Sequence, residues 1–447
     1  MTTFIILPNQ LFENNYRFLK EFSKVFIIEE PYYFSGSIKP NKIKVAYLRA
    51  CMRYYYEDLR ANKINVIYIT FDEIIKDNYL FLNGKEVFVY ELTDFKLQLK
   101  YKSLKIKFTE LETLMFIMNH DDLKTYDRPT PAHASFYEMA KQKLGILKGI
   151  KNQDVYNRKN PKTIIDTNID ISYITAKTLK YYKDGIEYAN TNRFKEHIGN
   201  PTLDTIKIYP ITSFDAYKAF NYFLENNFIN FGNYQDVIQD TNPFMYHAII
   251  SPMLNNGLLL PLKLIKILEN RKQRISLSSY EGFVRQIIGW REYMRYLYLY
   301  KYDSLISSNK HKNYKTIDKS WYSGTTGIIV LDTEIKKAIT YGYAHHIIRL
   351  MIFLNFLILS DINPNDIYKW FMEVVSIDAY DWVMVPNIYS MGNFSGIGMK
   401  RAYLSSSNYI LKMSNYKKDG KWDILWTDLF RSFVKSRKLN FYLRSIK

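Results

Sequence analysis

The sequence of 447 residues contains a single cysteine, Cys51. One thiol excludes a disulfide framework and any zinc or iron–sulfur site that is held by several cysteines. No apolar run reaches the ~20 residues that span a bilayer; the longest, 347–360, contains Arg349 and Asn355 and predicts a buried helix. The N-terminus has no basic segment before its apolar run, so no secretory signal is indicated. We therefore expect a cytoplasmic protein that does not enter a membrane.

Common nucleotide and metal motifs are also missing. No GxGxxG follows the first apolar run, and neither a Walker loop nor an HExxH sequence occurs. His345 and His346 are adjacent, so on a helix their side chains would point about 100° apart and could not easily share one ion. The sequence therefore predicts no metal site.

Basic residues are in excess. Lysine and arginine number 62 against 44 acidic residues, which gives a formal charge of +18 and a pI near 9.4. This charge favours an anionic partner, with nucleic acid first and an acidic membrane surface second. A basic protein encoded by an AT-rich genome would look the same. The aromatic content of 17% excludes disorder as the main state.

The first ~130 residues alternate strand and helix patterns, which predicts an α/β domain with a parallel sheet. The expected strands are 4–7, 25–28, 66–70 and 87–92, and the expected helix is 42–60. The polar stretch 148–200 predicts an interdomain linker. From Ser213, a plausible N-cap, helical patterns follow one another, most clearly in 281–297. We expect three parts: an α/β domain over 1–130, a linker over 131–205 and an all-helical domain over 206–447.

The stretch 261–320 combines thirteen Lys and Arg with five Asp and Glu, interleaved with tyrosine and tryptophan. Basic groups that pair with phosphates, beside rings that stack on bases, are typical of a nucleic-acid surface, with Arg285 and Arg295 as candidates. A solvated helix face over a core stripe is the alternative. Elsewhere, Asp378, Asp381 and Asn387 around Trp382 are polar groups in an apolar setting, and a nucleotide could supply their partners.

Several long motifs resemble the cryptochrome/photolyase family, and most closely its prokaryotic (6-4) photolyase branch of iron–sulfur bacterial cryptochromes and photolyases. The C-terminal motifs are the more specific: FGNYQDVI (231–238), YHAIISPMLNNGLL (246–259), EGFVRQIIGWREYMR (281–295), YAHHIIRLM (343–351), DINPNDIYKWFMEVVSIDAYDWVMVPN (361–387) and YLSSSNYILKMSNY (403–416). Weaker matches, such as FIILPNQL and SFYEMAKQKLGIL, extend the resemblance over nearly the whole chain.

The resemblance implies a Rossmann-like antenna domain, a helical domain that binds FAD, and light-driven repair of UV-damaged DNA by a monomer. The implied cofactor contacts are Tyr234, His247, Ser251, Gln286, Arg291, Arg349, Asp378, Tyr380 and Met384. The implied lesion-side residues are His345, His346, Tyr403, Tyr409 and Met391. The implied electron relay begins at Trp370, nearest the flavin, and continues to Tyr322, with Trp321 and Trp382 as alternatives.

His346 falls on the lesion-facing histidine of the (6-4) branch. A (6-4) photoproduct needs a hydroxyl transferred between two bases as well as an electron, and histidine exchanges protons near neutral pH. The leading hypothesis is therefore (6-4) photolyase activity. A cryptochrome-like photoreceptor that binds FAD with little or no repair is the alternative, and a degenerate scaffold without flavin is the third.

Three departures from the family pattern accompany these motifs. The four cysteines of the branch's [4Fe–4S] cluster are missing: the first would fall near Val330 and the others between Tyr416 and Trp422, so we expect no cluster. Packing by Trp422, Leu425 and Trp426 is expected to replace the cluster loop. Met384 stands where the family places a polar residue facing flavin N5, and Asn9 stands where an aspartate is usual near a lumazine antenna.

Overall fold

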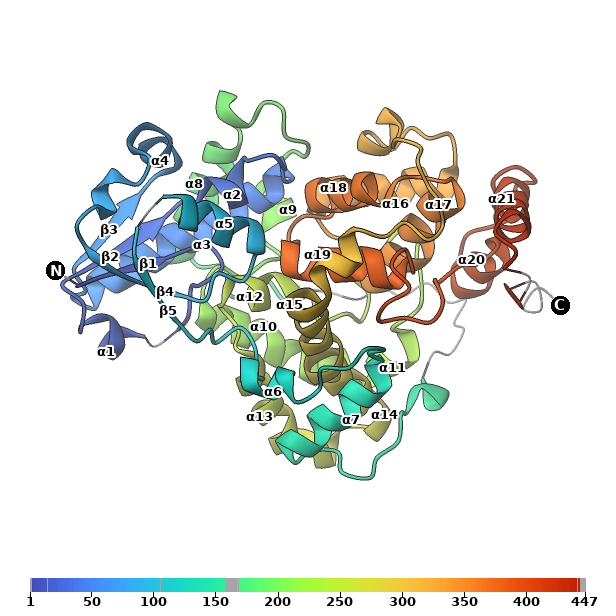
Figure 1. Cartoon of the computed structure of the whole chain (residues 1–447), viewed down its shortest axis with the longest axis horizontal. Coiled ribbons are helices and arrows are strands. Elements are labelled where there is room, and N and C mark those ends of the chain that lie inside the picture. Colours follow the sequence, from blue (N-terminus) through green and yellow to red (C-terminus); the bar gives the residue numbers. More distant parts are fainter. Residues whose placement is uncertain are drawn as a thin grey trace.

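The computed structural model describes residues 2–442 apart from 14, 105, 158–166, 168 and 440. Its N-terminal part contains a five-stranded parallel sheet in the order β3-β2-β1-β4-β5 (Figure 1). The strands are β1 (Thr2–Ile6), β2 (Lys24–Ile28), β3 (Val66–Ile69), β4 (Glu86–Tyr90) and β5 (Phe108–Leu111). Phe4 of β1 pairs with Val25 on one side and with Phe88 on the other. The strand order reverses between β1 and β4, which places a crevice at their carboxyl ends.

Helices alternate with the strands in this part of the chain. They are α1 (Tyr16–Leu19), α2 (Pro31–Phe34), α3 (Lys42–Ala61), α4 (Phe71–Asp77), α5 (Phe95–Ser103) and α6 (His120–Lys124), with a 3-10 turn η1 (Leu80–Leu82). The predicted α3 is confirmed: its stripe from Val45 to Leu59 is buried, and Asn41 caps it by accepting from the Ile43 amide at 2.9 Å. β5 was not predicted, because its sequence FTEL lacks an apolar run and no residue of it is fully buried.

The predicted linker contains regular structure. The elements of the predicted linker are α7 (His133–Leu144), η2 (Asp154–Tyr156), α8 (Ala176–Ala189) and η3 (Asn192–Phe194). A further helix, α9 (Leu203–Ile206), begins at its end. α8 packs on α3, and Gly185 makes this possible, since a Cβ there would lie 2.2 Å from the carbonyl oxygen of Ala46. The prediction of an interdomain linker over 148–200 did not include the helix α8. Thr175 caps α8 by accepting from the Thr178 amide.

The C-terminal part is helical, as predicted. Its α-helices are α10 (Ser213–Asn226), α11 (Phe228–Tyr234), α12 (Ser251–Asn256), α13 (Pro261–Arg271), α14 (Leu277–Val284), α15 (Glu292–Ile306), α16 (Ile329–Tyr341), α17 (Asn355–Leu359), α18 (Pro364–Val374), α19 (Asp381–Pro386), α20 (Ser407–Met413) and α21 (Trp422–Ser436). Two 3-10 turns are η4 (Lys272–Arg274) and η6 (Lys319–Tyr322). The N-cap of α10 is Thr212, which accepts from the Asp215 amide, and not Ser213.

Within the described residues, three segments of the helical part are π-helices: η5 (Arg285–Arg291), η7 (Ile348–Leu354) and η8 (Asn387–Met391). η5 joins α14 to α15, so the helix predicted over 281–297 is continuous but changes its pitch in the middle. π-helical segments often occur at functional sites.

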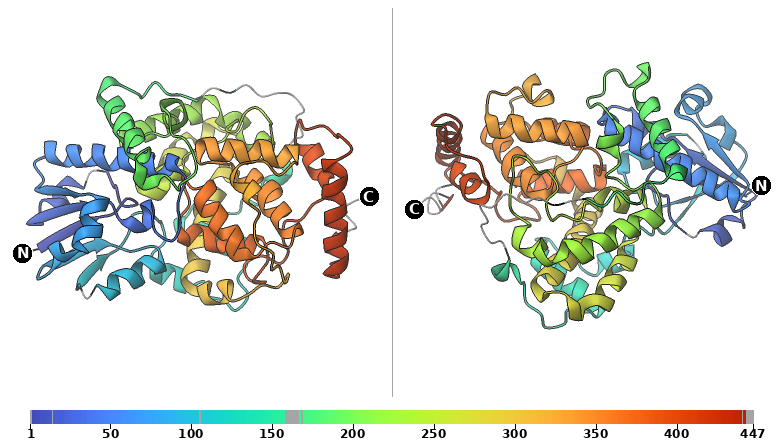
Figure 2. Two further views of the ribbon diagram at one scale, coloured as in Figure 1. Left: turned by 90° about the horizontal axis from the view of Figure 1, so that it is seen from above. Right: turned by 180° about the vertical axis from the view of Figure 1, so that it is seen from behind.

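The two parts lie side by side along the long axis, with the sheet at one end and α21 near the other (Figure 2). No helix among the described residues combines the length and the apolar character needed to span a bilayer.

Candidate functional site

One large cavity lies in the helical part, with a volume of about 890 Å³. This is near the upper end of the roughly 300–1,000 Å³ usual for small-molecule sites. Helices far apart in the sequence build its wall, among them α7, α12, α19 and α20. The π-helical segments η5, η7 and η8 all contribute to the same wall.

Most of the residues singled out in the sequence line this cavity. They are His247, Ser251, Arg285, Gln286, Arg291, His345, His346, Arg349, Asp378, Trp382, Met384, Met391, Tyr403 and Tyr409. The fold therefore brings the separate C-terminal motifs to one place.

A hydrogen-bonded chain of side chains crosses one wall. Arg349 donates from Nη2 to both carboxylate oxygens of Asp378, at 2.9 and 3.0 Å. Asn255 donates to the backbone carbonyl of Asp378 at 2.7 Å and accepts from Arg291. Burial lowers the pKa of Arg291 to about 10, and its guanidinium lies 4.7 Å from the ring centroid of Trp382. Two cations and one carboxylate give this wall a net positive charge that suits an electron-rich or anionic ring system.

The segment 248–251 lines the cavity and has an unusual backbone conformation. Ile249 has φ +51°, a strained left-handed conformation for a β-branched residue, and Ile250 follows in the right-handed region. Successive residues of opposite hand turn their N–H groups to one side and form an anion-binding concavity. Among the described residues, no hydrogen bond has an N–H of 248–251 as its donor. A phosphate group would satisfy these amides.

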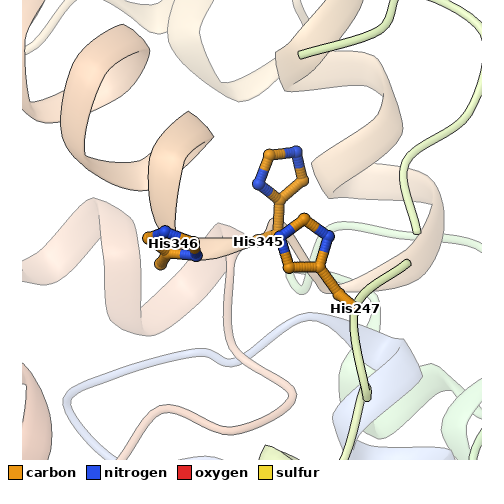
Figure 3. Close-up of side chains that lie close together, drawn as sticks. All are labelled: His247, His345 and His346. Atoms are coloured by element: carbon orange, nitrogen blue, oxygen red, sulfur yellow. The ribbon is translucent and has the colours of Figure 1, made fainter. Parts of the chain in front are cut away.

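Three histidines meet at another part of the wall (Figure 3). The rings of His247 and His345 are stacked, with centroids 4.3 Å apart and planes 18° from parallel. His345 directly precedes the helical residues, and its ring lies 6.2 Å from that of His346. His346 is half exposed, and its Nε2 lies 3.1 Å from Oδ1 of the buried Asp236. The Asp236 carboxylate can accept a hydrogen bond from Nε2 and thereby orient the His346 ring.

These histidines do not form a metal site in this arrangement, although their ring nitrogens lie within 4.8 Å of one another. Nearly parallel stacked rings cannot aim their in-plane lone pairs at one ion. Both nitrogens of His247 also face backbone carbonyls, those of Phe244 at 3.1 Å and Gln235 at 3.0 Å. Burial and the neighbouring His346 lower the pKa of His247 to about 4, while the hydrogen bonds to the two carbonyls oppose this shift.

Two predicted cofactor residues lie elsewhere. The ring of Tyr234 packs against Tyr246, with centroids 4.9 Å apart, and neither residue lines the cavity. Tyr380 is 1% exposed, and the Lys44 ammonium lies 4.1 Å from its ring centroid. At the start of α19 the chain turns Tyr380 toward the N-terminal part while Trp382 faces the cavity. The geometry does not support cofactor contacts for these two tyrosines.

Tyr380 lines a second cavity, of about 20 Å³, between the two parts of the molecule. Asp94 lies there, accepting from the Trp382 amide at 3.0 Å. Burial and the charge of Asp381 raise the pKa of Asp94 to about 7, and burial lowers the pKa of Lys44 to about 8. The volume holds one water molecule and does not fit a lumazine. At the crevice between β1 and β4, Asn9 is buried.

Trp370, the predicted first residue of the electron relay, does not line the cavity. Phe371 lines the wall, and Trp370 lies behind it, with ring centroids 5.2 Å apart. Trp370 donates to the backbone carbonyl of Trp321 at 2.8 Å and meets its ring edge-on at 5.4 Å. Tyr322 instead donates to Glu373 at 3.1 Å. The structure therefore pairs Trp370 with Trp321.

Arg295 does not face solvent, so its assignment to DNA binding is wrong. It is 3% exposed and donates to both carboxylate oxygens of Glu91, at 3.0 and 2.7 Å. This pair ties α15 to the carboxyl end of β4. Arg285 is also mostly buried and pairs with Asp154 and Glu281 at the cavity wall.

Carboxylates likewise neutralise much of the predicted basic surface over 261–320. The paired cations are Lys263, Arg271, Lys272, Arg285, Arg295, Lys301 and Lys315. By contrast, the segment 399–421 carries six cations, Lys400, Arg401, Lys412, Lys417, Lys418 and Lys421, with Asp419 as its one acid. None of these six forms an ion pair within the described part of the chain, and Lys412 lines the cavity.

Aromatic packing fills the region where cluster cysteines were expected. Trp422 and Trp426 are buried, and Trp426 meets Phe356 at 4.8 Å, whereas Leu425 is 45% exposed and does not take part as predicted. Val330 is buried within α16. Cys51, the only cysteine in the sequence, is buried in α3 of the N-terminal part. These residues do not fit a cluster held by four thiolates.

Sequence reasoning missed several residues of the wall. Asp236 and Asn255 lie inside motifs that had been recognised, but only their partners, His346 and Arg291, reveal their place. His133 of α7 lines the cavity from the segment taken for a linker, and its Nε2 is buried without a hydrogen-bond partner among the described residues.

Comparison with known proteins agrees with this architecture. Residues 4–203 match the family described as deoxyribodipyrimidine photo-lyase-related protein. A (6-4) photolyase from Agrobacterium fabrum is 28% identical over 409 residues, which cover 86% of this chain and 79% of that protein. The uncharacterized protein R855 of Acanthamoeba polyphaga mimivirus is 54% identical over 86 residues, 19% of this chain and 69% of its own length.

Solved structures of photolyases and cryptochromes have a similar fold. A bacterial class III photolyase from Agrobacterium tumefaciens superposes with a TM-score of 0.62 at 16% identity, covering 97% of this chain and 86% of its own. A cryptochrome from Synechocystis gives 0.57 at 13% identity, covering 97% and 89%. The chain thus has the photolyase/cryptochrome fold, as the sequence predicted. The resemblance to the photolyase-related proteins is confirmed by the family model over residues 4–203 and by the relative that is 28% identical.

Proposed function

We propose that this protein is an FAD-dependent photolyase that repairs pyrimidine (6-4) photoproducts in DNA. The observation that carries the proposal is His346: it is half exposed on the cavity wall, and the buried Asp236 holds its Nε2 at 3.1 Å. A histidine oriented by a carboxylate can give a proton to a bound photoproduct and take it back. The (6-4) photolyase relative supports the same assignment.

The residues of the cavity fit FAD. The amides of 248–251 would hold the pyrophosphate, and the Arg349–Asp378 pair would lie against the flavin ring. Bound FAD supplies light-driven one-electron chemistry. Arg291 adds positive charge near Trp382 and, through Asn255, fixes the backbone at Asp378. The apolar part of the wall excludes water from the reacting groups.

The deciding experiment is a repair assay on a defined (6-4) oligonucleotide with two single variants. His346→Asn should abolish repair while FAD stays bound, since asparagine hydrogen-bonds but cannot exchange a proton near neutral pH. Asp236→Asn should reduce repair and keep some activity, because it removes only the group that orients His346. Wild-type repair by His346→Asn, or a wild-type protein that repairs no lesion in light, would refute the proposal.

DNA binding is assigned to the unpaired cations of 399–421, next to Tyr403 and Tyr409. Replacing Lys400, Arg401 and Lys412 by alanine should weaken binding and lower the salt slope by about one for each phosphate that is no longer neutralised. The matched control replaces Lys263, Arg271 and Lys301, which are already ion-paired. Equal losses in both triples would contradict the assignment.

A photoreceptor with little repair activity is the second candidate, because of Met384. Its side chain lines the cavity and offers no strong hydrogen bond to a flavin. Blue-light reduction of bound FAD without lesion repair would favour this candidate. We further infer that the protein holds no [4Fe–4S] cluster, since it has one cysteine, and that the 20 Å³ cavity holds no lumazine. Iron and labile sulfide measured in anaerobically purified protein test the first point.

A further inference from the structure

The first turns of two helices, α5 of the N-terminal part and α19 of the helical part, are joined by their side chains (Figure 1). Asp94 is the N-cap residue of α5, yet its side chain does not cap that helix. Its Oδ1 instead accepts a hydrogen bond from the Trp382 amide of α19 at 3.0 Å, where the N-cap residue Tyr380 supplies no side-chain acceptor. In return, the Lys96 ammonium of α5 lies 3.3 Å from Oδ1 of Asp381. The start of α19 is therefore held by residues of the other part of the molecule.

The two carboxyl groups of this contact, Asp94 and Asp381, are fully buried but differ in their donors. Asp381 accepts from the hydroxyls of Tyr298 at 2.6 Å and Tyr368 at 2.5 Å, in addition to its contact with Lys96. Oδ2 of Asp94 has no hydrogen-bond partner in the structure, over the residues that it describes. A buried carboxylate costs free energy unless donors and opposite charges surround it. A proton in this contact therefore belongs on Asp94.

The small cavity of about 20 Å³ lies at the same contact, and Asp94 lines it together with Tyr33, Lys44 and Tyr380. The hydroxyls of both tyrosines are buried and, like Oδ2 of Asp94, unpaired across the described ranges of the chain. The Lys44 ammonium donates to the backbone carbonyl of Ala379. A polar space of this size gives an ionised Asp94 one water molecule in place of bulk solvent. The surroundings therefore favour the neutral carboxyl.

The balance of charges agrees with this geometry. Burial and the charge of Asp381 raise the pKa of Asp94 to about 7, and they outweigh the Trp382 amide and the Lys44 charge, which act in the opposite direction. Burial lowers the pKa of Lys44 to about 8. The tyrosines around the two carboxyl groups stay neutral in this range, because burial raises the pKa of each: Tyr32, Tyr33, Tyr298, Tyr302, Tyr368 and Tyr380.

We propose that Asp94 is a proton-controlled clasp between the two parts of the molecule. The neutral carboxyl holds the first turn of α19 against α5, and its ionisation places a second buried negative charge beside Asp381 and loosens this turn. α19 carries Trp382 and Met384 on the wall of the large cavity, so a proton in the N-terminal part determines how firmly that wall is held. This role is independent of the proposed light-driven chemistry.

Hydrogen exchange of the full-length protein, followed by mass spectrometry from pH 5 to pH 8, tests the clasp. When the turn opens, Asp94 regains its ordinary pKa of about 3.9. After correction for the intrinsic exchange rate, the opening constant of the amides 382–385 should therefore rise by up to about tenfold per pH unit from pH 5 to pH 7, and level off above pH 7. It should also exceed the opening constant of the most protected amides of α3, since α19 opens locally and not by global unfolding.

Asp94→Asn keeps an oxygen for the Trp382 amide but cannot ionise, so the opening constant of its α19 should not vary with pH. The matched control is Asp215→Asn, because burial also raises the pKa of Asp215, whose carboxylate lies in α10 and accepts from Thr212. The control should keep the wild-type pH dependence.

A wild-type opening constant that stays flat from pH 5 to pH 7 overturns the inference, whatever the variants do. So does a slope that survives in Asp94→Asn, a control that loses the slope as well, or an α19 that opens only together with the most protected amides of α3.

Discussion

Replacing Arg295 by methionine removes the guanidinium that joins α15 to the carboxyl end of β4. The substitution deletes two hydrogen bonds to Glu91, one of 2.7 Å to the Met118 carbonyl, and the interaction with the Phe116 ring 4.2 Å away. Removing one member of a buried ion pair costs about 3–5 kcal/mol. His120, 3.2 Å from Glu91, remains as a partner and places the expected loss near the lower end of that range.

A loss of about 3 kcal/mol corresponds to a Tm lower by roughly 6–12 °C for a unit of 150–250 residues. Arg295→Lys keeps the charge but cannot form the two-pronged contact, so its loss should be smaller. DNA affinity at neutral pH should stay unchanged in both variants, because Arg295 is buried. Urea unfolding and anisotropy with damaged DNA measure the two effects separately. Lower DNA affinity with an unchanged urea midpoint would show that the buried-pair reasoning is wrong.

The same pair has a pH signature. Burial raises the pKa of Glu91, but its hydrogen bond with His120 and the charge of Arg295 outweigh burial and leave that pKa lowered. A carboxyl with a lowered folded-state pKa adds stability above its unfolded value, about 4.3, and loses it as the pH falls through the folded value. Without Arg295 the folded-state pKa of Glu91 rises toward the unfolded value, so the variant should lose less stability than the wild type when the pH falls below about 5. Identical acid profiles of Arg295→Met and wild type would contradict this.

Three further predictions concern other parts of the molecule. Trp382→Phe should slow light-driven reduction of bound FAD more than Trp370→Phe, because only Trp382 lines the cavity; the reverse order in photoreduction rates would restore Trp370 as the first donor. The raised pKa of Asp94, about 7, adds stability that is full below pH ~4 and is lost as the pH rises through 7. Asp94→Asn should therefore flatten the fall in the urea midpoint between pH 5 and pH 8, and an unchanged slope would exclude this contribution. Gly185→Ala should destabilise by about 1–3 kcal/mol, since its Cβ meets a backbone oxygen of α3 at 2.2 Å, and an unchanged urea midpoint would show that α8 can move away.

Local patterns predicted the elements well, because each depends on residues near one another in the chain. The stripe of α3 and the apolar strands needed only periodicity. The motifs brought Arg349, Asp378 and His346 to the same cavity, since a resemblance carries over the positions of a whole motif. α8 was missed because its buried face contains Tyr181, Tyr182 and Gly185, which look polar or helix-breaking in sequence.

Long-range partners and side-chain directions could not be predicted. Arg295 looked like a phosphate ligand because its carboxylate partner, Glu91, lies in another part of the sequence. Tyr380 and Trp382 are two residues apart, and only the turn at the start of α19 decides which one faces the cavity. In the same way, Phe371 takes the wall position expected for its neighbour Trp370.

The three π-helical segments set the angular phase of the helices around the cavity. A π-turn holds about one residue more than an α-turn, so everything beyond it is rotated by about 100° relative to an uninterrupted helix. Deleting one residue from η5 would allow this segment to become a regular α-helix. The deletion would also rotate Arg291 and Arg295 away from their partners, Asn255 and Glu91. Insertions and deletions at η5, η7 and η8 should therefore be far less tolerated than substitutions. In these segments, the number of residues determines which side chains face the cavity, in addition to the residue types.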